Sequence, residues 1–167
     1  MDFDFYIAQF NASLANINKK DFNKQGLQLH VGVVLNSVAL KIYKLEWSGD
    51  INNPITATSR IFFSIWVSDK TIKEGRLYYN IHALKLSALP GYKITSRNFA
   101  AQFRKEFRKQ MKEWPNVELN FGPLTLMEGW VELNDQSLQK DISVLTARFL
   151  KVCPLIDQLL LEYKIEQ

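Results

Sequence analysis

The sequence predicts an α+β fold made of one domain, residues 1–167, in which helices pack on a mostly antiparallel sheet. Between residues 27 and 86, apolar side chains recur with a period of two in four segments, which is typical of strands. The short links between these segments favour an antiparallel meander. At the start, middle and end of the chain, the apolar period is between three and four, which is typical of helices. The composition, 47% hydrophobic and 23% charged, excludes disordered, collagen-like and low-complexity chains.

The first part of the chain predicts a short amphipathic helix followed by a hairpin. The helix is expected over residues 3–18, where apolar side chains are spaced among polar ones. The hairpin strands are expected over residues 27–34 and 38–47. Asn36 and Ser37 are the expected turn residues, although Asn-Ser is a weaker hairpin signal than Asn-Gly.

Two further strands, residues 60–68 and 76–86, complete the expected meander. The first is apolar on both faces, which is typical of a strand that lies inside a sheet or is covered on both sides. Aromatic side chains of the predicted strands fit either the core or an exposed stacking platform, and alternation within strands favours the core. These aromatic residues are Trp47, Phe62, Trp66, Tyr78 and Trp130.

The segment 96–114 predicts a helix with Ser96 as its N-cap and Pro115 as its stop. Its apolar stripe has a spacing of four residues and is expected to face the core: Phe99, Phe103, Phe107 and Met111. Its opposite sector carries cations that are expected to face solvent: Arg97, Arg104, Lys105, Arg108, Lys109 and Lys112.

After this helix, the sequence predicts a later hairpin and a long final helix. The hairpin strands are expected over residues 117–121 and 124–133. The final helix runs to about Tyr163 and stays in phase through Pro154, which predicts one kinked helix rather than two. Its wide apolar surface favours packing on the chain's own sheet, and a homodimer through this C-terminal helix is a further expectation.

Charge is distributed unevenly along a chain whose net charge is +4. Residues 70–112 carry eleven Lys and Arg residues against two acids, whereas residues 113–167 carry four against nine. The cationic helix sector therefore has three interpretations. It contacts the phosphates of a nucleic acid, it docks an acidic protein or the acidic tail of a neighbouring subunit, or it is a solvated surface.

The usual fingerprints of catalytic and metal sites are missing from the sequence. It contains no phosphate-binding Gly-Lys-Ser/Thr loop, no Gly-x-Ser-x-Gly elbow, no His-Glu-x-x-His and no paired Cys-x-x-Cys. The lone Cys153 cannot form an internal disulfide and is expected as a buried apolar filler. No cofactor and no metal ion are therefore expected.

Two histidines are the remaining candidates for general acid or base chemistry. His30, Tyr78, Asn80 and His82 lie on polar faces of the predicted strands, and they form a small polar pocket if those strands are neighbours. Glu46 is a candidate carboxylate partner. The favoured interpretation is a set of sheet residues that satisfy one another's hydrogen bonds.

The leading functional hypothesis is a non-enzymatic, cytosolic binding or assembly module that uses the basic helix face of residues 97–112, the long C-terminal helix, or both. Two acids near the start, no run of about 18 apolar residues and a single cysteine favour the cytoplasm and argue against a membrane partner. Nucleic-acid binding through the basic helix is the first alternative. A small enzyme built on His30 and His82 is the second.

Overall fold

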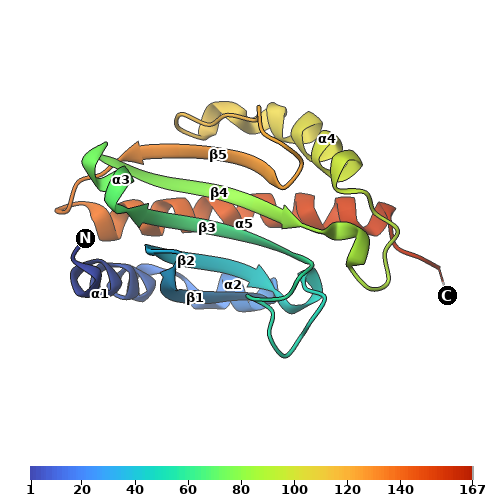
Figure 1. Ribbon diagram of the computed structural model, residues 1–167, viewed down its shortest axis with the longest axis horizontal. Coiled ribbons are helices and arrows are strands. Elements are labelled where there is room, and N and C mark those ends of the chain that lie inside the picture. Colours follow the sequence, from blue (N-terminus) through green and yellow to red (C-terminus); the bar gives the residue numbers. More distant parts are fainter. Residues whose placement is uncertain (167) are drawn as a thin grey trace.

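The chain folds around a five-stranded antiparallel sheet with the strand order β1-β2-β3-β4-β5 (Figure 1). The computed structural model describes residues 1–166. The α+β class and the meander of the first four strands are confirmed. The strands are β1 (Leu27–Val34), β2 (Ser37–Lys44), β3 (Arg60–Ser68), β4 (Arg76–Leu84) and β5 (Thr125–Glu132).

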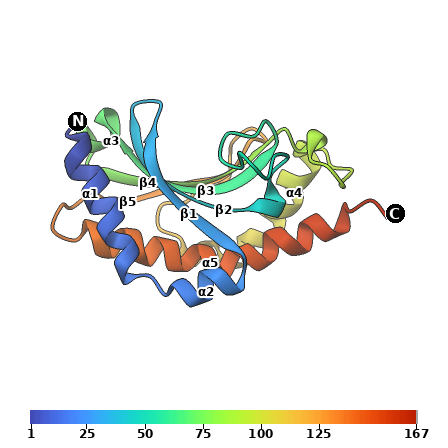
Figure 2. The ribbon, with the colours of Figure 1, turned by 90° about the horizontal axis from the view of Figure 1, so that it is seen from below.

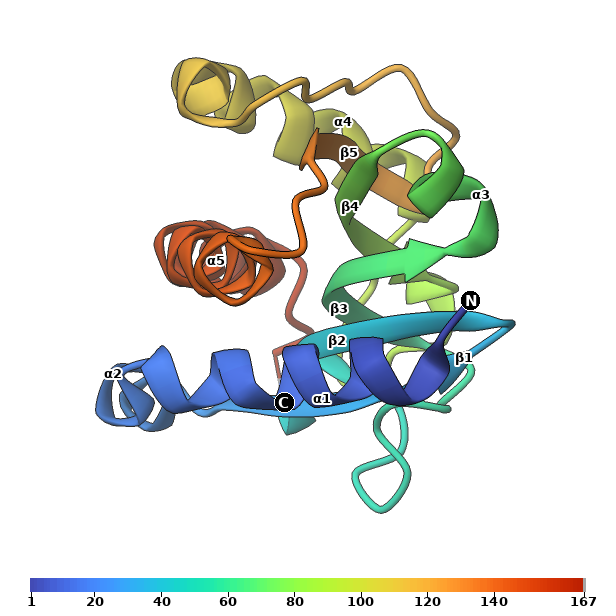
Figure 3. The same cartoon turned by 90° about the vertical axis from the view of Figure 1, so that its left-hand side faces the viewer.

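Helices cover one face of the sheet, which is called the inner face here. The α-helices are α1 (Phe3–Ser13), α2 (Lys19–Lys24), α3 (Asp69–Lys73), α4 (Ser96–Phe107) and α5 (Leu138–Glu162). Helix α5 runs across the inner face between α1 and α4, and both of these helices contact it (Figure 3). The opposite face, the outer face, presents the alternate side chains of the strands, and an open pocket lies on it.

The core lies between the inner face and the helices. Phe99, Phe103 and Phe107 of α4 are fully buried, as the four-residue spacing predicts. Helix α5 continues through Pro154 as one element, and its apolar stripe from Leu138 to Leu160 is buried within the chain's own fold. Packing on the chain's own sheet therefore accounts for that stripe, whereas Leu161 beside it is 65% exposed, and a homodimer stays a prediction.

The first hairpin turns one residue earlier than predicted. Val34 pairs with Ser37, so the turn residues are Leu35 and Asn36 rather than Asn36 and Ser37. Both have positive φ, 48° and 62°, as a two-residue turn of type I′ requires. Leu35 is 94% exposed at this tip, and the hairpin extends beyond the neighbouring strand in Figure 2. The sheet register thus outweighs the poor left-handed propensity of leucine.

The later hairpin is reduced to one strand, β5, which pairs with β4. Of the segment 117–121, Glu118 alone forms a bridge, and its backbone exchanges two hydrogen bonds with Glu128. The backbone carbonyl groups at the start of β5 accept hydrogen bonds from the guanidinium of Arg104 instead. The Arg104 side chain thus bonds to backbone carbonyl groups that a partner strand would have bonded in the predicted hairpin.

Two helices also differ from their expected bounds. Helix α1 ends at Ser13, and the separate short helix α2 precedes β1. The N-cap of α4 is Thr95, whose hydroxyl accepts a hydrogen bond from the Asn98 amide, rather than Ser96. Beyond Phe107 the chain tightens into a 3₁₀ segment up to Glu113, so the expected α-helix to residue 114 is shorter by two turns.

Candidate functional site

The cations of the predicted basic helix do not share one role. Arg104 is half-buried, and its guanidinium donates to the carbonyl oxygens of Gly122 and Thr125, both at 2.8 Å, and of Leu126 at 3.1 Å. Burial lowers the pKa of Arg104, and the charge of Arg108 adds to this effect. Arg104 therefore fixes the connection between α4 and β5 and is not free for an anionic partner.

The remaining cations form an exposed basic surface, which consists of Arg97, Lys105, Arg108, Lys109 and Lys112. Lys109 pairs with Glu106 of the same segment at 2.6 Å. Among residues 1–166, no carboxylate lies within 4.0 Å of the other four. The carboxylates of residues 113–166 therefore form no ion pair with these four cations, although Glu162 lines the same pocket as Lys105.

The two histidines do not come together. His30 is exposed on the edge strand β1, and His82 lies on β4, three strands away. Three strand spacings separate their backbones by at least about 14 Å. Asn80 and His82 line the outer-face pocket, whereas His30 and Tyr78 do not. The predicted four-residue cluster is thus divided, and of its members Asn80 and His82 alone line this pocket.

The outer-face pocket has a volume of about 360 Å³ and lies over the middle strands. The lining residues that carry the argument are Lys41 of β2, Arg60, Phe62 and Trp66 of β3, and Asn80 and His82 of β4. Their positions follow from strand alternation, because Leu40, Ile61 and Ile81 next to them point into the core. Neither Lys41 nor Arg60 was a candidate from the sequence.

Phe62 is the centre of the pocket's geometry. The Nζ atom of Lys41 lies 4.7 Å from the centroid of its ring, and the guanidinium carbon of Arg60 lies 5.3 Å from it. The ring of His82 lies 5.2 Å away on the next strand. Two cations and an imidazole thus surround one aromatic ring, and cation–π attraction favours this arrangement.

The two cations of the pocket lack an acidic partner. Among the described residues, no carboxylate lies within 4.0 Å of Lys41 or Arg60. Burial lowers the pKa of Lys41, whose exposed fraction is 8%, and the charge of Arg60 lowers it further. Burial also lowers the pKa of Arg60, one of whose terminal nitrogens donates to the Ala57 carbonyl.

The surroundings of His82 favour its neutral form. Burial lowers its pKa, and the charges of Lys41 and Arg60 lower it as well, against a hydrogen bond to the Leu124 carbonyl that raises it. Its Nδ1 atom lies 3.3 Å from that carbonyl oxygen. An Nδ1–H group that donates there leaves Nε2 as a hydrogen-bond acceptor.

Three buried polar atoms of the pocket have no hydrogen-bond partner within the described chain: Arg60 Nε, Trp66 Nε1 and Asn80 Oδ1. Asn80 is 3% exposed, and its amide nitrogen donates to Glu128 at 3.2 Å while its oxygen stays free. Buried polar groups are nearly always paired in native proteins. These two unused donors and one unused acceptor belong to residues that line the pocket, although the atoms themselves are buried.

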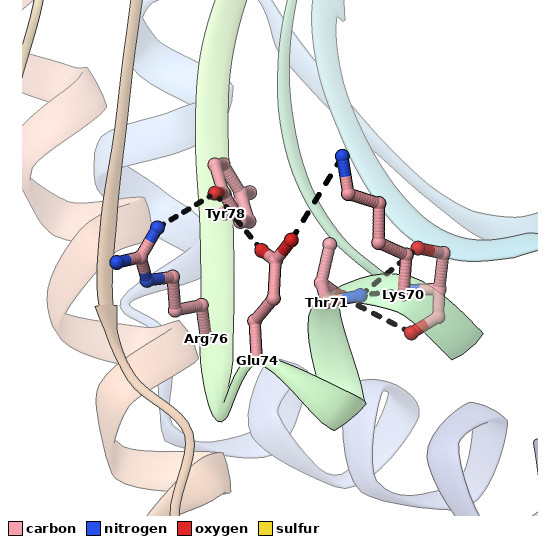
Figure 4. A network of polar contacts seen from close by, with 6 residues as sticks. Lys70, Thr71, Glu74, Arg76 and Tyr78 are labelled. Atoms are coloured by element: carbon pink, nitrogen blue, oxygen red, sulfur yellow. Dashed lines mark hydrogen bonds and ion pairs between the residues drawn. The ribbon is translucent and has the colours of Figure 1, made fainter.

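Aromatic side chains continue across the outer face beyond the pocket. Trp66 stacks on Tyr78 with their centroids 5.2 Å apart, and the guanidinium of Arg76 lies 4.0 Å from the centroid of Trp130. Tyr78 donates to Glu74 at 3.3 Å and accepts from Arg76 at 3.4 Å (Figure 4). The favoured core position is thus wrong for Trp66, Tyr78 and Trp130, which are half-buried on the outer face. It is right for Trp47, which is 1% exposed.

Cys153 is buried, as expected, within a polar cluster at the other side of the sheet. Burial raises the pKa of its thiol to about 11, and the charge of Asp157 contributes to this rise. Asp157 also pairs with Lys44 at 2.5 Å and accepts from the indole of Trp47 at 2.9 Å. A thiol held protonated in this way is a poor nucleophile.

Comparison with protein-family models, curated proteins and solved structures finds no match to this chain. Within residues 1–166, no group of three or more His, Cys, Asp and Glu side chains is placed to hold a metal ion. No helix in the described part of the chain is both long and apolar enough to span a bilayer.

Proposed function

We propose that the chain is a ligand-binding module and that its outer-face pocket binds a small organic anion with a flat apolar part. The observation that carries this proposal is the pair of cations, Lys41 and Arg60, over the ring of Phe62 without a carboxylate partner among residues 1–166. Leaving a buried charge uncompensated costs several kcal/mol. A bound carboxylate or phosphate offsets that cost.

The three buried, unpaired polar atoms suggest the rest of the ligand, which reaches them after a small shift of the side chains around them. Asn80 Oδ1 requires a donor, such as a hydroxyl or an amide N–H group. Trp66 Nε1 and Arg60 Nε require acceptors, and the faces of Phe62 and Trp66 favour a planar apolar group. The expected ligand therefore combines an anionic group, a donor and an aromatic or conjugated body.

Acidic side chains argue against a polynucleotide on the same face. Glu128 bonds to Asn80, Glu74 bonds to Tyr78, and Glu132 is the register partner of Arg76. A chain of phosphates that crossed the outer face would meet these carboxylates. A small anion bound beside Lys41 and Arg60 avoids these carboxylates. The charge distribution of the outer face therefore favours a small ligand over a polynucleotide.

The test is binding of aryl carboxylates and aryl phosphates, with 4-(hydroxymethyl)benzoate as the reference compound. We expect saturable binding, measured by calorimetry and by NMR shifts of the Trp66 indole. Arg60→Met is expected to weaken binding about tenfold or more, because a charged hydrogen bond contributes roughly 1.5–3 kcal/mol. Lys140→Met removes one exposed cation far from the pocket and serves as the charge-matched control. Equal affinities of Arg60→Met and Lys140→Met would refute the proposed site.

Nucleic-acid binding through the basic surface is a second candidate function, supported by the exposed cations Arg97, Lys105, Arg108 and Lys112. The test is retention of the protein on heparin and binding of DNA and RNA at several salt concentrations. Affinity that falls steeply with salt, and that falls in a combined Arg97→Gln and Arg108→Gln variant, supports it. A flat salt response refutes it.

A further inference from the structure

We propose that Lys41 is a nucleophilic amine and forms an imine with the carbonyl group of a ligand in the outer-face pocket. The inference rests on the proposed function, since it makes the bound anion an aldehyde or ketone. It adds a covalent step that anion binding alone does not require.

The position of Lys41 is unusual for a lysine. It lies on β2, the second strand of the sheet, between the core residues Leu40 and Ile42 of the same strand. Its side chain is on the outer face, where it lines the pocket and its Nζ atom lies over Phe62. The amine thus faces a cavity large enough for a ligand while most of its surface is withdrawn from water.

An amine attacks a carbonyl only when it is unprotonated, and the surroundings of Lys41 favour that form. The titratable groups that face it are basic: His30 is its register partner on β1, Arg60 lies on β3, and His82 lies on β4. Glu128, the acid that lines the pocket, is on β5 and is bonded to Asn80. Burial and the charge of Arg60 both lower the pKa of Lys41.

The reaction is an ordinary condensation. The lone pair of Nζ forms a bond to the carbonyl carbon, and the resulting carbinolamine loses its oxygen as water. Both hydrogens of that water come from the amine, so a primary amine and a carbonyl give an imine and one water molecule. No oxidant or reductant takes part in this step.

Arg60 fixes which carbonyl compounds suit the pocket. Its guanidinium and the Nζ atom of Lys41 lie over the same ring, so an anionic group on Arg60 keeps the ligand's carbonyl close to the amine. Holding two groups together in this way raises their effective concentration. The expected ligand class is therefore an aldehyde or ketone that carries a carboxylate or phosphate on a flat body.

The experiment uses 4-formylbenzoate with the full chain. Cyanoborohydride reduces an imine to a stable secondary amine, and peptide mass spectrometry then locates the label. We expect about tenfold more label at Lys41 than at the exposed Lys140, because bound ligand reacts at a raised effective concentration. Label spread evenly over the lysines would overturn the inference.

Controls separate the imine from simple binding. Excess 4-(hydroxymethyl)benzoate, which has the same shape but no carbonyl, is expected to protect Lys41 from label. Lys41→Arg keeps a cation but removes the amine, so the label that forms rapidly in the native sequence is expected to disappear. The Lys140→Arg protein is expected to keep that label. Binding of 4-(hydroxymethyl)benzoate without label at Lys41 would overturn the imine and leave the proposed function standing. Absence of both binding and label would overturn the imine and the proposed function together.

Discussion

Lys41 and Lys44 lie on opposite faces of β2, each with an exposed fraction of 8%, and their pKa values move in opposite directions. Burial lowers the pKa of Lys41, and the charge of Arg60 adds to that effect. Burial also acts to lower the pKa of Lys44, but its hydrogen bond and ion pair with Asp157, together with the neighbouring Cys153, outweigh burial and raise it. The same strand therefore holds one lysine that is satisfied within the fold and one that is not.

Lys41→Met is expected to stabilise the protein, because it removes a desolvated cation from a site beside Phe62 and Arg60. A gain of about 1 kcal/mol corresponds to a rise in Tm of roughly 2–4 °C for a chain of this size. The pH dependence follows from the lowered pKa of Lys41. Between that pKa and the ordinary value of 10.5, the unfolded chain binds more protons than the folded one, so stability of the native sequence rises with pH.

The measurement is urea unfolding of the native sequence and of Lys41→Met between pH 7 and pH 10. The stability difference between the two proteins is expected to shrink as the pH rises. A constant difference, or a less stable Lys41→Met at pH 7, would contradict the assignment of Lys41 as a destabilising cation.

Asp157→Ala is expected to destabilise the protein by about 2 kcal/mol. The substitution leaves the ammonium of Lys44 and the indole N–H of Trp47 without their acceptor inside the fold. This expected loss of stability is smaller than the loss for a fully buried ion pair, because the Asp157 side chain is 41% exposed. Urea unfolding gives the free energy of unfolding.

A double-mutant cycle with Lys44→Met checks the cause of that loss. The double variant is expected to lose less stability than the sum of the two single variants, because it removes the stranded charge together with its partner. Strict additivity would show that the pair is energetically unimportant.

The sequence was sufficient for most of the fold because periodicity reports which side of each element is buried. The period of two located four strands in their order, and the stripe of Phe99, Phe103 and Phe107 gave the buried side of α4. The turn at Leu35 and Asn36 could not be predicted from the sequence. The register of the whole hairpin determines its position and outweighs the local turn preferences of these residues.

The candidate site was mostly hidden from the sequence. Alternation places Phe62 and Trp66 on one face of β3, but it does not say whether a second layer covers that face. One signal was present: Lys41 stands between Leu40 and Ile42 in a strand that is otherwise apolar there, and an interior lysine requires an explanation. Arg60 gave no such signal, because its position at the start of a strand is ordinary for a solvated arginine.

Arg104→Gln is expected to destabilise the protein by about 1–3 kcal/mol, although the sequence places Arg104 among solvent-facing cations. Its guanidinium satisfies three backbone carbonyl groups between Gly122 and Leu126, and glutamine cannot reach all of them. Arg97→Gln removes the same charge from an exposed position and is expected to change stability by less than about 0.5 kcal/mol. Urea unfolding of the two variants compares them directly. Equal stabilities would mean that Arg104 is only a surface charge.

Gly129→Ala is expected to cost more than about 2 kcal/mol, because an added methyl group has no room on the inner face of β5. A Cβ atom there would lie 2.3 Å from the hydroxyl oxygen of Tyr79 and 2.9 Å from the Pro115 carbonyl oxygen. Tyr79 is fully buried and donates to that carbonyl at 2.6 Å, so it cannot move aside without losing the bond. Gly122→Ala, where nothing lies within 4 Å of the added atom, is the matched control and is expected to be nearly neutral. Thermal unfolding distinguishes the two variants, and a Gly129→Ala protein as stable as Gly122→Ala would show that β5 does not approach Tyr79 this closely.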